Sequence, residues 1–110
     1  MDVPDFNFYI VNNGNETIKF YFKFSNKELT SKDFNSPPYV KILPNSKFKE
    51  GAADEFFKNN NKLWVLIFKE STLEKHTWQD IQNNNIFDKR FSLSLEEIKA
   101  LNFEVIYDGS

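Results

Sequence analysis

Apolar side chains occupy every second position from Ile18 to Phe24, and this alternation constrains the fold more than any other feature of the sequence. Successive residues of a β-strand point to opposite faces, so a period of two places these side chains on one face of a strand. A similar alternation runs from Phe6 to Val11, and the turn-forming segment Asn12-Asn13-Gly14-Asn15 separates the two runs. Such a segment between alternating runs is typical of a β-hairpin. The sequence therefore predicts two paired antiparallel strands at the N-terminus.

Several shorter segments also have the character of strands. The segment from Lys62 to Lys69 holds six consecutive apolar residues between two lysines, which favours a strand buried on both faces at the centre of a sheet. Phe103, Val105 and Tyr107 alternate in a last strand. The remaining candidates are Tyr39–Leu43, Lys47–Glu50 and the extended segment that holds Phe87, Phe91 and Leu93.

Short helices are predicted in the connections. Ser71 to Glu74 and Ser94 to Glu97 fit the capping box, in which the serine oxygen accepts a hydrogen bond from the third helical N–H and the glutamate reaches back. Thr77 to Asp80 is a weaker signal of the same kind, and Gly51 is expected to open a helical segment from Ala52 to Asn60. Six or seven strands with two or three short helices predict a mainly β fold, an antiparallel β-sandwich of immunoglobulin-like or transthyretin-like type. The length of 110 residues suits one such domain over residues 1–110.

Composition excludes several classes of function. A net charge of −2 and a single arginine, Arg90, argue against nucleic acid as a partner, because nucleic-acid binding normally needs a basic face. The longest apolar run, Leu63 to Phe68, is far shorter than the ~20 residues of a membrane-spanning helix. The absence of cysteine removes thiolate nucleophiles, disulfides and cysteine-based zinc sites.

Residues with catalytic or metal-binding chemistry are sparse. His76 is the only histidine, and its neighbours indicate an exposed helix surface in preference to a general base. Asp80 and Asp88 are the acids that a carboxylate-based hydrolase would use, although no pattern places them across a cleft. The oxygen-rich segments 59–61 and 83–88 lack the spacing of a calcium-binding loop. We therefore predict a protein that is not an enzyme and that has no cofactor and no metal.

Aromatic residues give the one positive indication of a site. Tyr9 and Tyr21 fall on outward positions of the two predicted N-terminal strands, where they are expected to lie close together. With Trp64 and the residues Tyr39 and Trp78 they could form an exposed platform for a sugar or a peptide. The alternative interpretation is that these rings cover a half-solvated sheet face, where aromatic residues are favoured in any case.

The chain also resembles a known family. The clearest matching segments lie in the second half of the chain and are Phe56–Asn59, Leu63–Phe68, Ser71–Ile81, Lys89–Asn102 and Phe103–Tyr107. The N-terminal half matches more loosely, through Asn12–Phe22 and Ile42–Ser46, so the similarity covers nearly the whole chain. They are similar to segments of small uncharacterised proteins of Bacteroidetes that often carry a lipoprotein signal before one sandwich-like domain. His76 stands where that family tends to have tyrosine, and Phe91 also replaces a tyrosine. The resemblance implies a lipid anchor that precedes the sequence given, and a periplasmic or cell-surface location. The protein is expected in the cytoplasm if Met1 is the native start.

Three functions follow as expectations. The first is a non-enzymatic binding or structural module of a bacterial envelope protein, with an unknown protein or a glycan as its partner. The second is a protein–protein interaction module in which the strand Phe6 to Val11 lies at a sheet edge and accepts a partner strand. The third is a hydrolase that uses Asp80 and Asp88 in a concave pocket.

Overall fold

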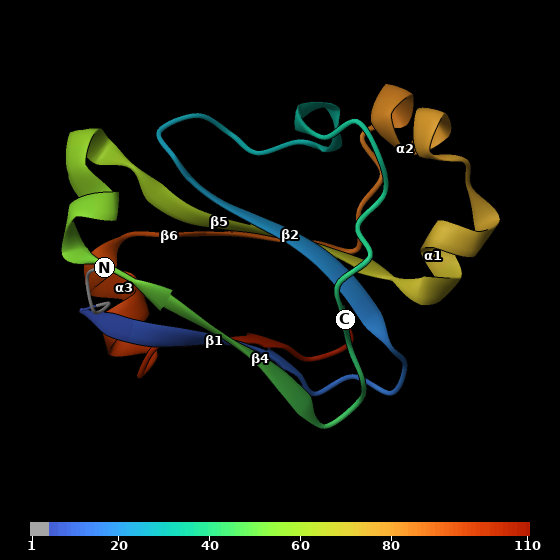
Figure 1. Ribbon diagram of the computed structural model, residues 1–110. Helices are drawn as coiled ribbons and strands as arrows, with labels where there is room; N and C mark the ends of the chain where they lie inside the picture. Colours follow the sequence, from blue (N-terminus) through green and yellow to red (C-terminus); the bar gives the residue numbers. More distant parts are fainter. Residues whose placement is uncertain (1–4) are drawn as a thin grey trace.

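The computed structural model describes residues 5–110 and shows two β-sheets that face each other (Figure 1). The three-stranded sheet has the order β4-β1-β7 and contains β1 (Phe6–Asn12), β4 (Ser46–Ala52) and β7 (Glu104–Tyr107). The four-stranded sheet has the order β3-β2-β5-β6 and contains β2 (Ile18–Ser25), β3 (Lys41–Ile42), β5 (Lys62–Lys69) and β6 (Lys89–Leu93). The predicted mainly β, two-sheet architecture is confirmed. Residues 1–4, which include the question of a native start at Met1, lie outside the described residues.

Short helices lie in the connections, as predicted. They are the 3-10 helices η1 (Ser31–Asp33) and η2 (Asp54–Asn60) and the α-helices α1 (Glu70–Lys75), α2 (Trp78–Asn84) and α3 (Leu95–Ala100). None of the helices in residues 5–110 is long and apolar enough to cross a lipid bilayer. Two boundaries differ from the prediction, since Gly51 belongs to β4 and the strand expected from Tyr39 to Leu43 is only two residues long.

The predicted N-terminal hairpin is wrong. β1 and β2 belong to different sheets, so the segment between them is an arch that crosses the sandwich. Phe8 and Ile10 of β1 and Ile18 and Phe20 of β2 are all buried in one core. An arch lets both strands direct their apolar faces into the same interior from opposite sides, whereas a hairpin would place both strands in a single sheet.

The side chain of Asn12 holds the arch in place. Its Oδ1 accepts a hydrogen bond from the backbone N–H of Gly14 at 2.9 Å. Its Nδ2 donates to the carbonyl oxygens of Glu16 at 2.8 Å and Ile42 at 2.9 Å. Asn12 is fully buried, and these three bonds satisfy its amide group without water.

One pairing departs from the predicted antiparallel pattern. β1 pairs with β4 in antiparallel orientation on one side and with β7 in parallel orientation on the other, with Ile10 opposite Val105. The first strand, β1, therefore lies in the middle of the three-stranded sheet, and the last strand, β7, lies beside it at one edge. Parallel neighbours need a long connection, and here the whole four-stranded sheet lies between them in sequence.

Phenylalanine side chains from both sheets fill the interior. The rings of Phe8 and Phe22 meet edge to face with centroids 5.5 Å apart, and those of Phe20 and Phe48 lie 4.9 Å apart. Such arrangements suit the charge distribution of aromatic rings. The rings connect the two sheets into one core.

The prediction that residues 62–69 form a central strand with two buried faces is confirmed. β5 lies between β2 and β6. Val65 and Ile67 point into the sandwich core, while Leu66 and Phe68 belong to a second apolar cluster with Ile81 of α2. Helices α1 and α2 and the segment around η1 therefore cover the outer face of the four-stranded sheet.

The helix starts are confirmed in two cases out of three. Ser94 and Glu97 form the predicted capping box of α3, and the Thr77 hydroxyl accepts from the backbone N–H of Asp80 at 3.1 Å. Ser71, by contrast, is not a cap, because α1 begins one residue earlier at Glu70. The backbone N–H of Ser71 donates instead to Oε1 of Glu16 at 3.1 Å. A carboxylate from the arch thus replaces the predicted local cap.

Candidate binding surface

The predicted aromatic residues do not form one platform. Tyr9 lies between the buried residues Phe8 and Ile10 of β1, so its ring is on the outer face of the three-stranded sheet. Tyr21 is on β2, in the other sheet. The expectation that Tyr9 and Tyr21 lie close together is wrong, because it depended on the hairpin that does not form. The ammonium group of Lys47 instead lies over the ring of Tyr9, 4.6 Å from the ring centroid.

Tyr21 and Trp78 are engaged within the chain. The ring of Tyr21 stacks on Phe34 with centroids 3.7 Å apart, and its hydroxyl donates to the carbonyl oxygen of Ser36. The indole N–H of Trp78 donates to the carbonyl oxygen of Phe34 at 3.1 Å. These contacts hold the connection between β2 and β3 on the outer face of the sheet, which leaves neither ring free as a platform for a sugar.

Trp64 and Arg90 are also engaged in contacts within the chain. The indole N–H of Trp64 donates to the carbonyl oxygen of Ser25 at 3.1 Å. The guanidinium of Arg90 lies 4.8 Å from the ring centroid of Phe87 and pairs with Glu28 at 3.2 Å. The single arginine therefore fastens the residues after β2 to the outer face of the sheet.

Tyr39 differs from the other predicted residues because it is 83% exposed. Val40 and Leu43 are 39% and 53% exposed, so three large apolar side chains are open to solvent within five residues. The segment follows Pro37 and Pro38, whose nitrogens carry no hydrogen and cannot donate to a neighbouring strand. This explains why β3 begins only at Lys41 and leaves these side chains beside the sheet.

An apolar hollow of about 170 Å³ lies next to this segment, and we call it the edge hollow. It is lined by Phe20, Tyr21 and Phe22 of β2, by Tyr39 and Val40, and by Phe48 of β4. β2 and β4 belong to different sheets, so the hollow lies at the side of the sandwich between the two layers. Figure 1 shows the connection that leads from β2 to β4 crossing from one sheet to the other, and Tyr39 and Val40 of this connection line the hollow.

The edge hollow lies along an unpaired strand edge. β3 pairs with β2 only at Ile18 and Lys19, whereas β5 pairs with β2 along its whole length. Within residues 5–110, no strand therefore pairs with the outer edge of β2 from Phe20 to Ser25. The predicted edge strand, Phe6 to Val11, is wrong, because β1 lies between β4 and β7. The open edge beside an apolar hollow is that of β2.

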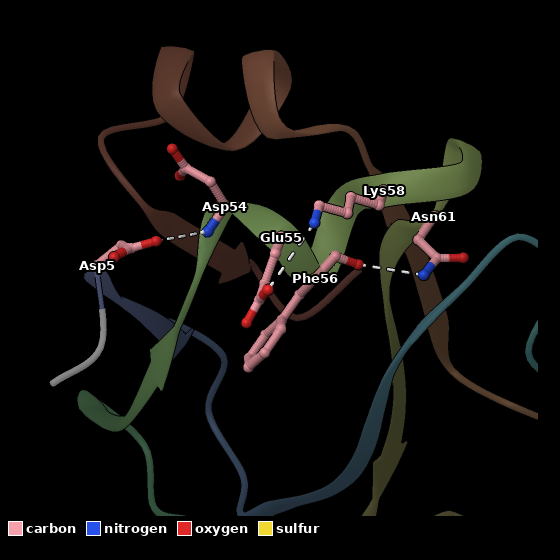
Figure 2. A network of polar contacts seen from close by, with 6 residues as sticks. All are labelled: Asp5, Asp54, Glu55, Phe56, Lys58 and Asn61. Atoms are coloured by element: carbon pink, nitrogen blue, oxygen red, sulfur yellow. Dashed lines mark hydrogen bonds and ion pairs between the residues drawn. The ribbon is translucent and has the colours of Figure 1, made fainter. Parts of the chain in front are cut away.

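Most of the residues that line a second, larger hollow are polar or charged, and we call it the polar hollow. It measures about 360 Å³ and lies between η2 and the start of α3, lined by Asp54, Phe57, Lys58, Asn60, Asn61, Lys62, Ser94, Leu95 and Glu96. Figure 2 shows the contacts that shape η2 at its rim. The backbone N–H of Asp54 donates to Asp5 at 3.0 Å, the amide of Asn61 donates to the carbonyl of Phe56 at 3.2 Å, and Lys58 pairs with Glu55 at 3.9 Å. Charges of both signs meet here at the solvent-exposed surface.

The acids considered for catalysis lie elsewhere. The carboxylate of Asp88 accepts the backbone N–H of Lys69 at 2.7 Å and the hydroxyl of Thr72 at 3.1 Å, so it supports the start of α1. Asp80 is exposed on α2, and neither acid lines the edge hollow or the polar hollow. His76 is the C-terminal cap of α1. No three His, Asp or Glu side chains among residues 5–110 are grouped so that they could hold a metal ion.

Sequence reasoning found two residues of the edge hollow, Tyr21 and Tyr39, and missed the others. Phe20, Phe22 and Phe48 have the pattern of core residues, and Phe20 is indeed buried. Whether they also line a hollow depends on where β3 stops pairing with β2. The double proline before Tyr39 was the available signal, because it predicts an interruption of strand pairing.

Comparisons of the chain with protein families, with curated proteins and with solved structures gave no match.

Proposed function

We propose that this chain is a non-enzymatic interaction module that binds an extended segment of another protein along the open edge of β2. The observation that carries the proposal is the juxtaposition of an unpaired strand edge, from Phe20 to Ser25, with the apolar edge hollow. An unpaired edge presents backbone N–H and C=O groups that a further strand can bind. The hollow offers a place for an apolar side chain of that strand.

Two features favour a peptide over a glycan. A sugar ring is usually held by exposed aromatic faces, but of Tyr21, Tyr39 and Trp78 only Tyr39 is largely exposed, because Tyr21 stacks on Phe34 and the indole of Trp78 is bonded to the same segment. The exposed residues Tyr39, Val40 and Leu43 place three apolar side chains within five positions, and the first two line the edge hollow. Contiguous exposed apolar side chains mark protein interaction sites.

The polar hollow supports a binding role less well. Its side chains carry both charges, and those of Glu55 and Lys58 at its rim are more than half exposed. Charged pairs in such solvated positions contribute little to binding, because water screens them. An extended ligand gains more from backbone hydrogen bonds and an apolar contact at the β2 edge.

Selection of peptides from a random display library, followed by NMR titration into the 15N-labelled chain, tests this function. We expect enriched peptides to shift the amide signals of residues 20–25 and 39–40 and to slow hydrogen exchange in residues 20–25. A library that yields no binder, or shifts confined to the polar hollow, would contradict the proposal.

A matched pair of variants locates the site. Val40→Asp places a charge on the wall of the edge hollow and is expected to weaken peptide binding at least ~10-fold, since it replaces an apolar contact. Leu101→Asp alters a similarly exposed apolar residue at the end of α3 and is expected to leave the affinity unchanged. Circular dichroism checks that both variants keep the fold. Equal affinity in the two variants argues against the edge hollow.

The envelope location is part of the same proposal and rests on the resemblance of residues 54–107. Fractionation of cells that express the gene with its native upstream sequence tests it. Recovery from the membrane or periplasmic fraction supports the location, and recovery from the cytoplasm contradicts it.

A further inference from the structure

Lysine residues are frequent on β2, β3 and β4, the strands at or next to the edge hollow. β2 carries Lys19 and Lys23, β3 carries Lys41, and β4 carries Lys47 and Lys49. The only acid in these three strands is Glu50 of β4. Lys19, Lys23 and Lys41 lie on the outer face of the four-stranded sheet, whereas Lys47 and Lys49 lie on the outer face of the three-stranded sheet with Tyr9. The outer face beside the open edge of β2 is thus basic, although the chain as a whole has a net charge of −2.

Two of these lysines stand directly opposite each other. Lys19 of β2 is the register partner of Lys41 of β3, and like charges in directly opposed positions destabilise a sheet. The ion pairs formed within residues 5–110 are Lys58–Glu55 and Arg90–Glu28, so neither Lys19 nor Lys41 forms an ion pair with an acid of the described chain. Lys23 lies farther along the same face of β2, in line with the unpaired part of the strand.

Protection of a free edge explains only part of this arrangement. Lysines on an edge strand prevent unwanted pairing, and Lys47 and Lys49 on β4, Lys41 on β3 and Lys23 on the unpaired part of β2 have that character. Lys19, however, lies where β2 is paired on both sides, by β3 and by β5. Its positive charge guards no open edge, and it stands opposite a second positive charge.

We propose that the partner segment is an acidic strand in which apolar residues alternate with Glu or Asp. The inference rests on the proposed function, because it assumes that a strand adds to β2. Side chains of an added strand alternate between the two faces of the sheet. Those on the inner face lie beside Phe20, Phe22 and the edge hollow, and those on the outer face lie beside Tyr21 and Lys23, next to the Lys19–Lys41 pair. Apolar side chains suit the first position and carboxylates suit the second.

Three fluorescein-labelled peptides of equal length, with valine alternating with Glu, Thr or Lys, test this inference by fluorescence anisotropy. We expect the Glu peptide to bind about tenfold more tightly than the Thr peptide, and the Lys peptide to bind most weakly. The advantage of the Glu peptide should shrink as the salt concentration rises from about 50 mM to about 500 mM, because the lysines are at the surface. Equal affinity of the Glu and Thr peptides overturns the acidic partner but leaves strand addition intact. If no peptide binds, the proposed function itself fails.

The variant Lys41→Gln separates a binding role from a structural one. It removes one of the two opposed charges, so the free protein should be as stable as the wild type or more stable, while the Glu peptide should bind about threefold more weakly. Binding of the Thr peptide should not change. Lys99→Gln, on the exposed surface of α3, is the control and should alter neither peptide's affinity. An unchanged affinity of Lys41→Gln for the Glu peptide would overturn the inference.

Discussion

Tyr107 carries a buried polar atom without a partner. Its side chain is 1% exposed, and its hydroxyl is the one buried side-chain polar atom in residues 5–110 that makes no hydrogen bond. Burial raises the pKa of this phenol above its usual value of 10, and the nearby carboxylates of Asp88, Glu16 and Asp108 raise it further. An unsatisfied buried hydroxyl costs stability, because the unfolded chain can bond it to water.

Tyr107→Phe is therefore expected to match or exceed the wild type at pH 7, by up to ~1 kcal/mol. Because the pKa is raised in the folded state, the neutral phenol contributes stability that is present below pH 10 and is lost as the pH rises toward the folded pKa. Tyr107→Phe has no phenol to ionise at this position, so its stability should fall less than that of the wild type as the pH rises. Urea denaturation at pH 7 and across pH 9 to 11 measures both effects.

Tyr39→Phe serves as the control, because its hydroxyl is exposed and hydrated in the folded and the unfolded chain. It should follow the wild type at every pH. A Tyr107→Phe protein clearly less stable than the wild type at pH 7 would show that the hydroxyl has a partner.

The start of α1 depends on an acid that is distant in sequence. Its N-cap residue, Lys69, provides no side-chain cap, and the N–H of Ser71 donates to Glu16 from the arch. This hydrogen bond is the main reason that the pKa of Glu16 is lowered, and Lys69 and Lys75 lower it further. The arch between the sheets and the first helix are thereby linked.

Glu16→Gln should cost about 0.5–1 kcal/mol at pH 7, since it removes a negative charge from the N-terminal end of a helix. The pKa of Glu16 is depressed in the folded state, so its contribution is present above the ordinary pKa of 4.5 and is lost as the pH falls through the folded pKa. The wild type and the variant should therefore converge in acid. Chemical denaturation from pH 3 to pH 7 checks this.

Glu74→Gln is the matched substitution on α1, at an exposed position without an ion pair in residues 5–110. It should change stability by no more than ~0.5 kcal/mol. Equal stability of Glu16→Gln and wild type at neutral pH would mean that water replaces the carboxylate without cost.

Elements whose environment is local in sequence could be predicted, and pairings between distant elements could not. β5 could be predicted because six apolar residues in a row, between two lysines, favour a short strand covered on both faces. The segment from Asn12 to Asn15 was misread, because a hairpin and an arch use the same turn-forming residues. What decides between them is which sheet receives β2, and that depends on its pairing with β5, far along the chain.

The candidate site shows the same limit. Tyr39 was identified from its residue type, and it lines the edge hollow together with Tyr21. Tyr9 and Trp78 were grouped with them, but their positions follow from sheet order and from contacts with Phe34. The open edge of β2 exists only because β3 ends after two residues. No single segment of the sequence indicates how far β3 pairs with β2.

The molecule has two apolar clusters that share one strand. The inner cluster lies between the sheets, and the outer cluster lies under α1, α2 and the segment around η1. β5 is the strand that contributes fully buried residues to both, with Val65 and Ile67 inside and Leu66 and Phe68 outside. The outer layer can therefore open without exposing the interior of the sandwich, in the manner of other locally unfolding units.

Two equal substitutions distinguish these layers. Ile81→Val, in the outer cluster, and Ile10→Val, in the inner cluster, each remove one buried methyl group at a cost of about 0.5–1.5 kcal/mol. In native-state hydrogen exchange, Ile81→Val should speed exchange in α1, α2 and residues 25–38 while the amides of β1 and β4 keep wild-type protection. Ile10→Val should speed exchange in β1 and β4 as well, because it weakens the interior on which global stability depends. Loss of protection in β1 by the same amount in both variants would mean that the two layers unfold as one cooperative unit.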